Sequence, residues 1–233
     1  MTDVPVDDPE VLRRILADTE ALLLDFDGPI CSVFAGFPAH VVADQLRDVL
    51  AEGGYRDLPD DVAKSEDPFD VFKYAATLGE EEARYVEAAF RAHEAEAIPT
   101  AEPTPGAHDL IRAWKATGRK LAIVSNNSTA AIETYLGLHT LHDRIDYIAA
   151  RSSSDVTLLK PSSYLVNSAI TVLQVPPAKS TLVGDSAADI EAAQRAAVKV
   201  IGYANRSSKL ITLSSSAIVV TQLNLRPFIK QPE

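Results

Sequence analysis

The sequence has few of the residues that cross-link a protein or anchor it in a membrane. It contains one cysteine, Cys31, in 233 residues, which excludes an internal disulfide and a zinc site built from several cysteines. Its longest apolar runs, such as Leu121–Val124, are far shorter than the roughly 20 residues that cross a bilayer. We therefore expect a cytoplasmic protein that folds around its own hydrophobic core.

Positive charge is also scarce. The chain has 22 lysines and arginines against 33 acidic residues, a formal net charge of −11. This balance argues against nucleic acid or a membrane surface as partner. A small phosphorylated metabolite stays compatible with it, because one lysine or one metal ion reverses the local field. The composition indicates no particular oligomeric state.

Short apolar runs alternate with amphipathic stretches along most of the chain. The runs predict strands at Ala21–Phe26, Lys120–Ser125, Tyr147–Ala150, Thr181–Gly184, Val198–Tyr203 and Ala217–Val220. The stretches predict helices at Ala107–Thr117, Thr129–Leu136, Ser163–Leu173 and Ala187–Ala196, with a first helix from Pro9 to Asp18. Apolar runs without alternation are typical of parallel strands covered on both faces. The fold class is therefore α/β, with a doubly wound parallel sheet.

Residues 33–98 interrupt this alternation. They contain no convincing strand and predict helices at His40–Ala51, Pro68–Leu78 and Glu80–Ala97, followed by the proline-rich segment Pro99–Gly106. The many charges of Glu80–Ala97 favour a solvent-exposed helix face. The simplest interpretation is a helical insertion, residues 33–98, in a core formed by residues 1–32 and 99–233.

Polar side chains follow four of the predicted strands. They are Asp25 and Asp27, then Ser125 and Asn126, then Lys160, and finally Asp185 and Asp189. Because ligands bind at the carboxyl ends of parallel strands, we expect these side chains to converge at one edge of the sheet. Acids, a hydroxyl and a lysine together suit the binding of Mg²⁺ and a phosphate group.

Each group has a chemical use at such a site. Asp25 and Asp185 offer carboxylates to Mg²⁺, with a backbone carbonyl near Asp27. Asp25 can attack phosphorus to give an aspartyl-phosphate, and Asp27 can donate and accept the proton. Ser125 and Lys160 can hold the phosphoryl oxygens.

Other interpretations of these residues stay open. Ser186 and Asp189 fit a helix capping box, so Asp189 is a helix cap or a positioning partner of the metal site as well as a possible ligand. Ser125, Asn126 and Asn127 could cap the following helix. Lys160 could be an exposed surface lysine.

The sequence contains four motifs that resemble, in type and in their order along the chain, those of the haloacid dehalogenase superfamily. The motifs are the strand and acidic loop Leu22–Gly28, the strand Leu121–Asn126, the pair Lys160-Pro161 and the segment Gly184–Asp189. Each is weak alone, but four in this order and spacing are specific. The resemblance covers nearly the whole chain and implies a Rossmann-like core.

The resemblance also implies roles for individual residues. Asp25 would be the nucleophile and Asp27 the acid and base. Mg²⁺ would lie at Asp25, Asp185 and the backbone of Asp27, and Ser125 and Lys160 would contact phosphate, with Asn126 beside them as a further candidate.

The insertion resembles the helical cap of the subfamily that contains phosphoglycolate phosphatases and β-phosphoglucomutases. The family's dehalogenases lack the second aspartate of the first motif, so Asp27 favours phosphoryl transfer. Pro29 departs from the family pattern and could stiffen the loop that carries the cap.

The expected function is a Mg²⁺-dependent phosphatase acting on a small phosphomonoester through an aspartyl-phosphate. The substrate would be a sugar phosphate, a nucleotide or a phosphorylated organic acid. A sugar phosphomutase using the same residues is the alternative, and a non-catalytic module that binds a phosphorylated ligand is a weaker one.

Overall fold

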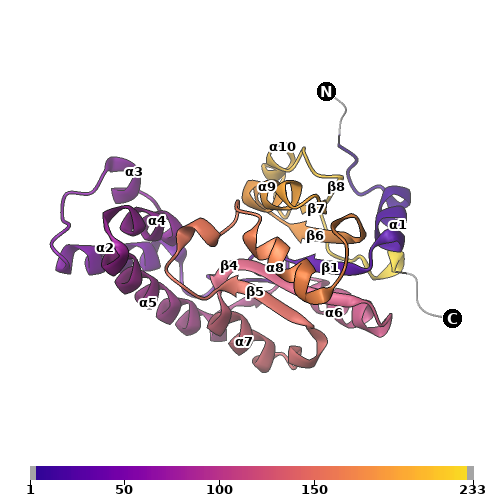
Figure 1. Cartoon of the computed structure of the whole chain (residues 1–233), viewed down its shortest axis with the longest axis horizontal. Coiled ribbons are helices and arrows are strands. Elements are labelled where there is room, and N and C mark those ends of the chain that lie inside the picture. The colour runs from indigo at the N-terminus through magenta and orange to yellow at the C-terminus, as the bar shows by residue number, and fades with distance from the viewer. Residues whose placement is uncertain (1–3, 230–233) are drawn as a thin grey trace.

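The computed structural model describes residues 4–229 as an α/β core with a group of helices at one end (Figure 1). Residues 1–3 and 230–233, which the predicted core range includes, lie outside the described part. The core sheet has six parallel strands in the order β5-β4-β1-β6-β7-β8. Its strands are β1 (Ala21–Leu24), β4 (Lys120–Ser128), β5 (Tyr147–Arg151), β6 (Ser180–Gly184), β7 (Lys199–Tyr203) and β8 (Ile218–Val220). The structure confirms the doubly wound, Rossmann-like parallel sheet.

Helices cover both faces of this sheet. They are α1 (Pro9–Asp18), α6 (Ala107–Ala116), α7 (Thr129–Leu138), α8 (Tyr164–Leu173), α9 (Ala187–Arg195) and α10 (Lys209–Thr212). Short 3-10 turns lie at Ile98–Thr100, His142–Arg144, Val156–Leu158, Pro177–Lys179 and Arg226–Phe228. Leu22 and Leu24 of β1 belong to the apolar cluster that includes α1, α6 and α7, while Leu23 belongs to the cluster that includes α8 and α9. A strand buried on both faces explains the continuous apolar run in the sequence.

The position of β1 determines which residues meet at the sheet edge. Leu24 pairs with Ile123 on one side and with Val183 on the other. The residues that follow these three positions therefore emerge side by side at the carboxyl ends of the central strands.

A second group of helices lies beyond these ends, on the left in Figure 1. It consists of α2 (Ala39–Glu52), α3 (Asp60–Ala63), α4 (Pro68–Leu78) and α5 (Glu80–Ala97). These helices share an apolar cluster that includes Leu46, Phe72 and Phe90. The three helices expected in the insertion are present, and the four-residue α3 is an addition too short for periodicity to predict.

A two-stranded antiparallel ribbon connects the two parts and was not predicted. Its strands, β2 (Cys31–Ser32) and β3 (Glu102–Pro103), pair Cys31 with Pro103 and Ser32 with Glu102. Two residues are too few to show an alternating pattern. The ribbon brings the beginning and the end of the inserted segment together.

The expectation of a solvent-exposed face on α5 is wrong at two of its acids. Glu87 is 6% exposed and Glu94 is 0% exposed. Both carboxylates pair with Arg151, which lies at the end of β5. The helix therefore carries a buried ionic face that a count of charges cannot distinguish from a solvated one.

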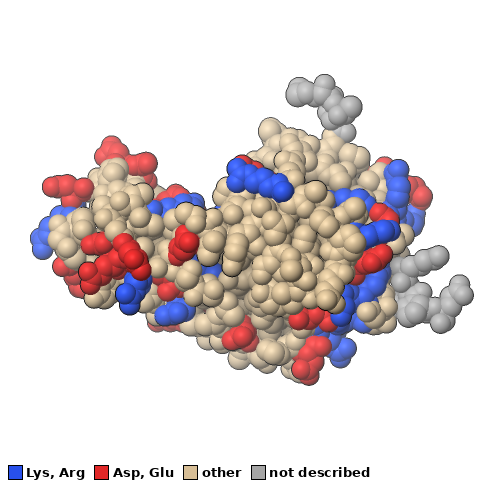
Figure 2. All heavy atoms as spheres, in the orientation of Figure 1, with Lys and Arg blue, Asp and Glu red and all other residues tan. Residues whose placement is uncertain are grey.

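The outer surface reflects the acidic composition. Figure 2 shows acidic side chains gathered over the end of the molecule formed by α2–α5, whereas much of the same face over the core is uncharged. Among the described residues, no helix combines the length and the hydropathy that a membrane crossing requires.

Candidate active site

Asp25 lies directly after β1 and is almost completely buried. Its backbone N–H donates to Val183 O at 2.9 Å, which continues the β1–β6 pairing by one bond. Its Oδ1 accepts from Phe26 N at 2.7 Å and lies 2.8 Å from Lys160 Nζ. Within residues 4–229, Oδ2 receives no hydrogen bond. One oxygen is therefore held in place while the other stays available for chemistry.

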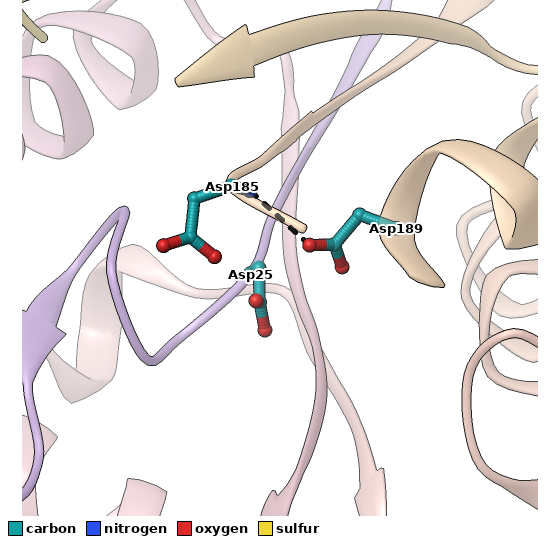
Figure 3. Close-up of side chains that lie close together, drawn as sticks. All are labelled: Asp25, Asp185 and Asp189. Carbon is teal, nitrogen blue, oxygen red and sulfur yellow. Dashed lines mark hydrogen bonds between the residues drawn. The ribbon is translucent and has the colours of Figure 1, made fainter. Parts of the chain in front are cut away.

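Two further carboxylates come from the end of β6 and the start of α9. One oxygen each from Asp25, Asp185 and Asp189 lies within 4.8 Å of the other two. Figure 3 shows the three side chains around a common point at the sheet edge. The predicted convergence of these acids is thus present in the structure.

Gly28 permits this cluster to form. Its φ is +102°, and a Cβ added there would lie 2.3 Å from Asp185 Oδ2. Only glycine combines a positive φ with space for a neighbour at this distance. The loop after β1 can therefore pass directly beside Asp185.

Asp189 is held by the protein on both of its oxygens. It forms a capping box with Ser186 at the start of α9, and its Oδ2 accepts from Asp185 N at 3.1 Å and Ser186 N at 3.0 Å. Its Oδ1 accepts from Lys160 Nζ at 2.5 Å. Asp189 thus holds in place both the loop that carries Asp185 and the ammonium group of Lys160.

Lys160 is buried among these acids, so a surface position for it is excluded. Its ammonium lies between Asp25 and Asp189 and donates to Val124 O at 3.0 Å. Burial alone would lower the pKa of Lys160, but the two carboxylates outweigh it and raise that pKa. The lysine therefore keeps its positive charge at the centre of the site.

Negative charge exceeds positive charge around Asp25. Burial raises the pKa of Asp25 to about 8, with a further increase from Asp189 and an opposing effect of Lys160. Burial also raises the pKa of Asp185. A divalent cation would offset this repulsion, and the carboxylates of Asp25 and Asp185 are hard oxygen ligands of the kind that Mg²⁺ prefers. The donor set fits such an ion.

Lys209 also belongs to this site, although the sequence did not indicate it. Its ammonium pairs with Asp185 from the short helix α10, so it brings positive charge to the same carboxylate that was predicted to bind metal. Lys209 follows β7 in a segment without motif or periodicity, and no signal in the sequence places it near the other acids.

Asp27 stands apart from the three-carboxylate cluster. Its Oδ1 accepts from Val33 N at 2.9 Å, and burial raises its pKa to about 6. A carboxyl group with this pKa exists in both protonation states near neutral pH, which is the property that acid–base catalysis requires.

The residues after Ser125 differ in part from expectation. Ser128, not Ser125, Asn126 or Asn127, is the N-cap of α7 and accepts from Ala131 N at 3.3 Å. The capping interpretation of the three earlier residues is wrong, because β4 continues past Ser125 through an irregularity in its pairing with β5.

The side chain of Asn126 faces Lys160 rather than open space. Its Nδ2 donates to Lys160 O at 3.0 Å, and its Oδ1 accepts from Lys160 N at 2.8 Å. This pair of bonds fixes the backbone of the lysine. The phosphate contact predicted for Asn126 stays a prediction.

The chain belongs to the haloacid dehalogenase-like hydrolase family, whose sequence profile matches residues 40–203. The match includes Ser125, Lys160, Asp185 and Asp189 and begins after Asp25 and Asp27. The structure supplies the link between the two groups, since it places Asp25 beside Lys160 and Asp185.

Individual proteins are similar to this chain over part of its length. A phosphoglycolate phosphatase of Aquifex aeolicus is 33% identical over 143 residues, which are 58% of this chain and 66% of that protein. A plasmid-encoded phosphoglycolate phosphatase of Cupriavidus necator is 33% identical over 43% of this chain and 44% of its own. The matched regions thus span less than two thirds of these relatives.

The fold has close counterparts among solved structures. A predicted phosphatase from Clostridium acetobutylicum superposes with a TM-score of 0.68 at 18% identity, covering 91% of this chain and 98% of that one. At this identity the likeness concerns the fold alone.

Proposed function

We propose that this protein is a Mg²⁺-dependent phosphatase that hydrolyses a small phosphomonoester through an aspartyl-phosphate on Asp25. The observation that carries the proposal is the position of Asp25, with one oxygen fixed, one oxygen open, and Lys160 2.8 Å away. The similarity to proteins named phosphoglycolate phosphatase supports the same class of reaction. A phosphorylated organic acid, a sugar phosphate or a nucleotide would suit the site.

Asp25, Asp185 and the backbone carbonyl of Asp27 would hold the Mg²⁺. When bound, the ion supplies positive charge that offsets the clustered carboxylates and attracts phosphoryl oxygens. Asp189 acts as a positioning residue rather than a ligand, because both its oxygens accept hydrogen bonds from Lys160 and from the loop of Asp185.

The first half of the reaction forms a bond from Asp25 Oδ2 to phosphorus and breaks the bond to the ester oxygen. Asp27 gives its proton to that departing oxygen, so an alcohol leaves. Lys160 and Ser125 hold the phosphoryl oxygens, on which charge is concentrated during the transfer.

The second half returns the enzyme to its starting state. Asp27, now a carboxylate, takes a proton from water as the water oxygen bonds to phosphorus. The bond between phosphorus and Asp25 breaks, phosphate leaves, and both carboxyl groups regain their original forms. A pKa of about 6 for Asp27 allows both steps near neutral pH.

We further propose that residues 33–98 are a cap over a core formed by residues 1–32 and 99–233. The helices α2–α5 have their own apolar cluster and lie beyond the carboxyl ends of the sheet (Figure 1). A cap in this place excludes bulk water and bulky substrates during the transfer.

The test is phosphate release from a panel of monoesters that includes 2-phosphoglycolate, sugar phosphates and nucleotides, with Mg²⁺ and with EDTA. We expect release that needs Mg²⁺ and is lost in Asp25→Asn. Asp109→Asn, at an exposed position on α6, is the matched control and should retain full activity.

Three outcomes would contradict the proposal. Full activity in Asp25→Asn would exclude this nucleophile. Conversion of a sugar phosphate to its isomer without free phosphate would indicate a mutase. Phosphate binding without release from any ester would indicate the non-catalytic module.

A further inference from the structure

A buried ionic cluster lies between the proposed cap and the core, outside the reacting groups described above. Arg151 has a fully buried side chain and pairs with Glu87 at 2.6 Å and with Glu94 at 2.5 Å. Its guanidinium carbon lies 4.6 Å from the ring centre of Phe90 and 5.4 Å from that of Phe72. Two buried acids on one buried arginine are costly to desolvate, so their arrangement calls for an explanation.

Glu94 makes contacts that Glu87 does not. Its Oε1 accepts from Asn127 Nδ2 at 3.0 Å, and its Oε2 accepts from Ser128 N at 3.0 Å. Both partners belong to the segment that follows Ser125. Glu94 therefore connects α5 with the end of β4, in addition to neutralising Arg151.

Asn127 continues this path to the hydroxyl of Ser125. Ser125 Oγ donates to Asn127 Oδ1 at 3.1 Å, and Asn127 N donates to Ser125 Oγ at 3.3 Å. Glu94, Asn127 and Ser125 are 0%, 2% and 1% exposed, so water does not compete for these bonds.

From this geometry we propose that Glu94 is a positioning residue of the phosphate site, acting through Asn127 on Ser125. A carboxylate accepts hydrogen bonds and donates none, so it requires the NH₂ group of Asn127 to face it. The carbonyl of Asn127 must then face Ser125 and accepts the single hydrogen of its hydroxyl, so Glu94 holds that hydrogen away from a phosphoryl oxygen. This inference rests on the proposed function, in which Ser125 contacts the phosphoryl group.

The path also links the cap to the chemistry. Glu94 lies on the last turn of α5, within the inserted helices, whereas Ser125 belongs to the core sheet. The hydroxyl hydrogen of Ser125 is thus directed to Asn127 while α5 is seated against β4 and β5.

The test measures the binding of inorganic phosphate in the presence of Mg²⁺ by isothermal titration calorimetry, which requires no turnover. The variants are Glu94→Gln and Glu87→Gln, each with Ser125 and with Ser125→Ala. Glu87→Gln is the matched control, because it disturbs the same arginine and leaves Asn127 untouched. Circular dichroism and thermal melts show that each variant is folded at the temperature of the titration.

We expect Glu94→Gln to tighten phosphate binding by about three- to tenfold, because the Asn127 amide can then turn and free the Ser125 hydrogen for one hydrogen bond to the anion. In the Ser125→Ala background the same change should alter binding by less than about twofold, the range of independent sites. Glu87→Gln should stay within about twofold in both backgrounds.

The inference is overturned if Glu94→Gln weakens phosphate binding or leaves it unchanged, if Glu87→Gln tightens it as much as Glu94→Gln, or if the gain is equal in both backgrounds. Should Glu94→Gln not fold, Asn127→Ala keeps the ion pairs of Arg151 and must show the same dependence on Ser125. If the unchanged protein binds no phosphate, both this inference and the role of Ser125 are wrong. Coupling through Ser125 without hydrolysis of any ester would overturn the proposed function alone.

Discussion

Replacement of Arg151 by methionine should destabilise the fold more than any surface charge change. The side chain of Arg151 is fully buried, and the exposed fractions of Glu87 and Glu94 are 6% and 0%. Methionine keeps an apolar stem against Phe72 and Phe90, but it removes the cation paired with Glu94 and leaves Glu87 with its 3.9 Å contact to Arg91. Removing one partner of a buried ion pair costs about 3–5 kcal/mol, so we expect the free energy of unfolding to fall by that amount.

Urea unfolding followed by circular dichroism measures this difference. The midpoint should fall while the dependence on urea concentration stays unchanged, since the same surface is exposed on unfolding. Arg13→Met is the control. Arg13 is exposed, pairs with Glu10 and lies 5.5 Å from the ring centre of Phe228, and each of these contacts contributes about 1 kcal/mol or less.

A loss of less than about 1.5 kcal/mol in Arg151→Met would refute this reasoning. It would mean that the two acids relax into solvent when the arginine is removed, and that the ionic cluster does not hold α5 against the core.

Three further predictions concern the site and the first helix. Gly28→Ala should lower phosphatase activity at least about tenfold, because its Cβ would lie 2.3 Å from an oxygen of Asp185 and its φ disfavours a side chain; unchanged kcat/KM would contradict this. Lys209→Met removes the ammonium that pairs with Asp185 and that would compete with Mg²⁺ for this carboxylate. Mg²⁺ binding measured by calorimetry should therefore tighten about threefold, and weaker binding would contradict this competition. Two lysines lower the pKa of Asp18 to about 2, so the contribution of Asp18 to stability is complete above its unfolded pKa and is lost as pH falls toward 2. The melting temperatures of the unchanged protein and Asp18→Asn should therefore differ at pH 6 and converge near pH 2; a constant difference would refute the assignment.

The sheet was predictable because its central strands are buried on both faces. That burial demands continuous apolar runs such as Ala21–Leu24, which are visible in the sequence. The convergence of Asp25, Lys160 and Asp185 followed from topology, since polar residues after parallel strands share one edge.

Features that depend on contacts between distant segments were not predictable. Glu94 and Arg151 are separated by 57 residues, and the acids of α5 have the same sequence pattern as a solvated helix. Lys209 reaches Asp185 from a helix of four residues, which is too short to show a periodic pattern of apolar residues in the sequence. The phosphate contact expected of Asn126 stays a prediction, whereas the pairing of its side chain with the backbone of Lys160 is a local contact that no motif encodes.

The central claim is that Asp25 carries the phosphoryl group during turnover. The direct measurement is acid quenching of the enzyme with its best substrate from the panel and Mg²⁺, followed by borohydride reduction and peptide mass spectrometry. We predict modification of Asp25 in the unchanged protein and its absence in Asp25→Asn. Label on another residue, or turnover at the full rate with no covalent label in the unchanged protein, would contradict the account.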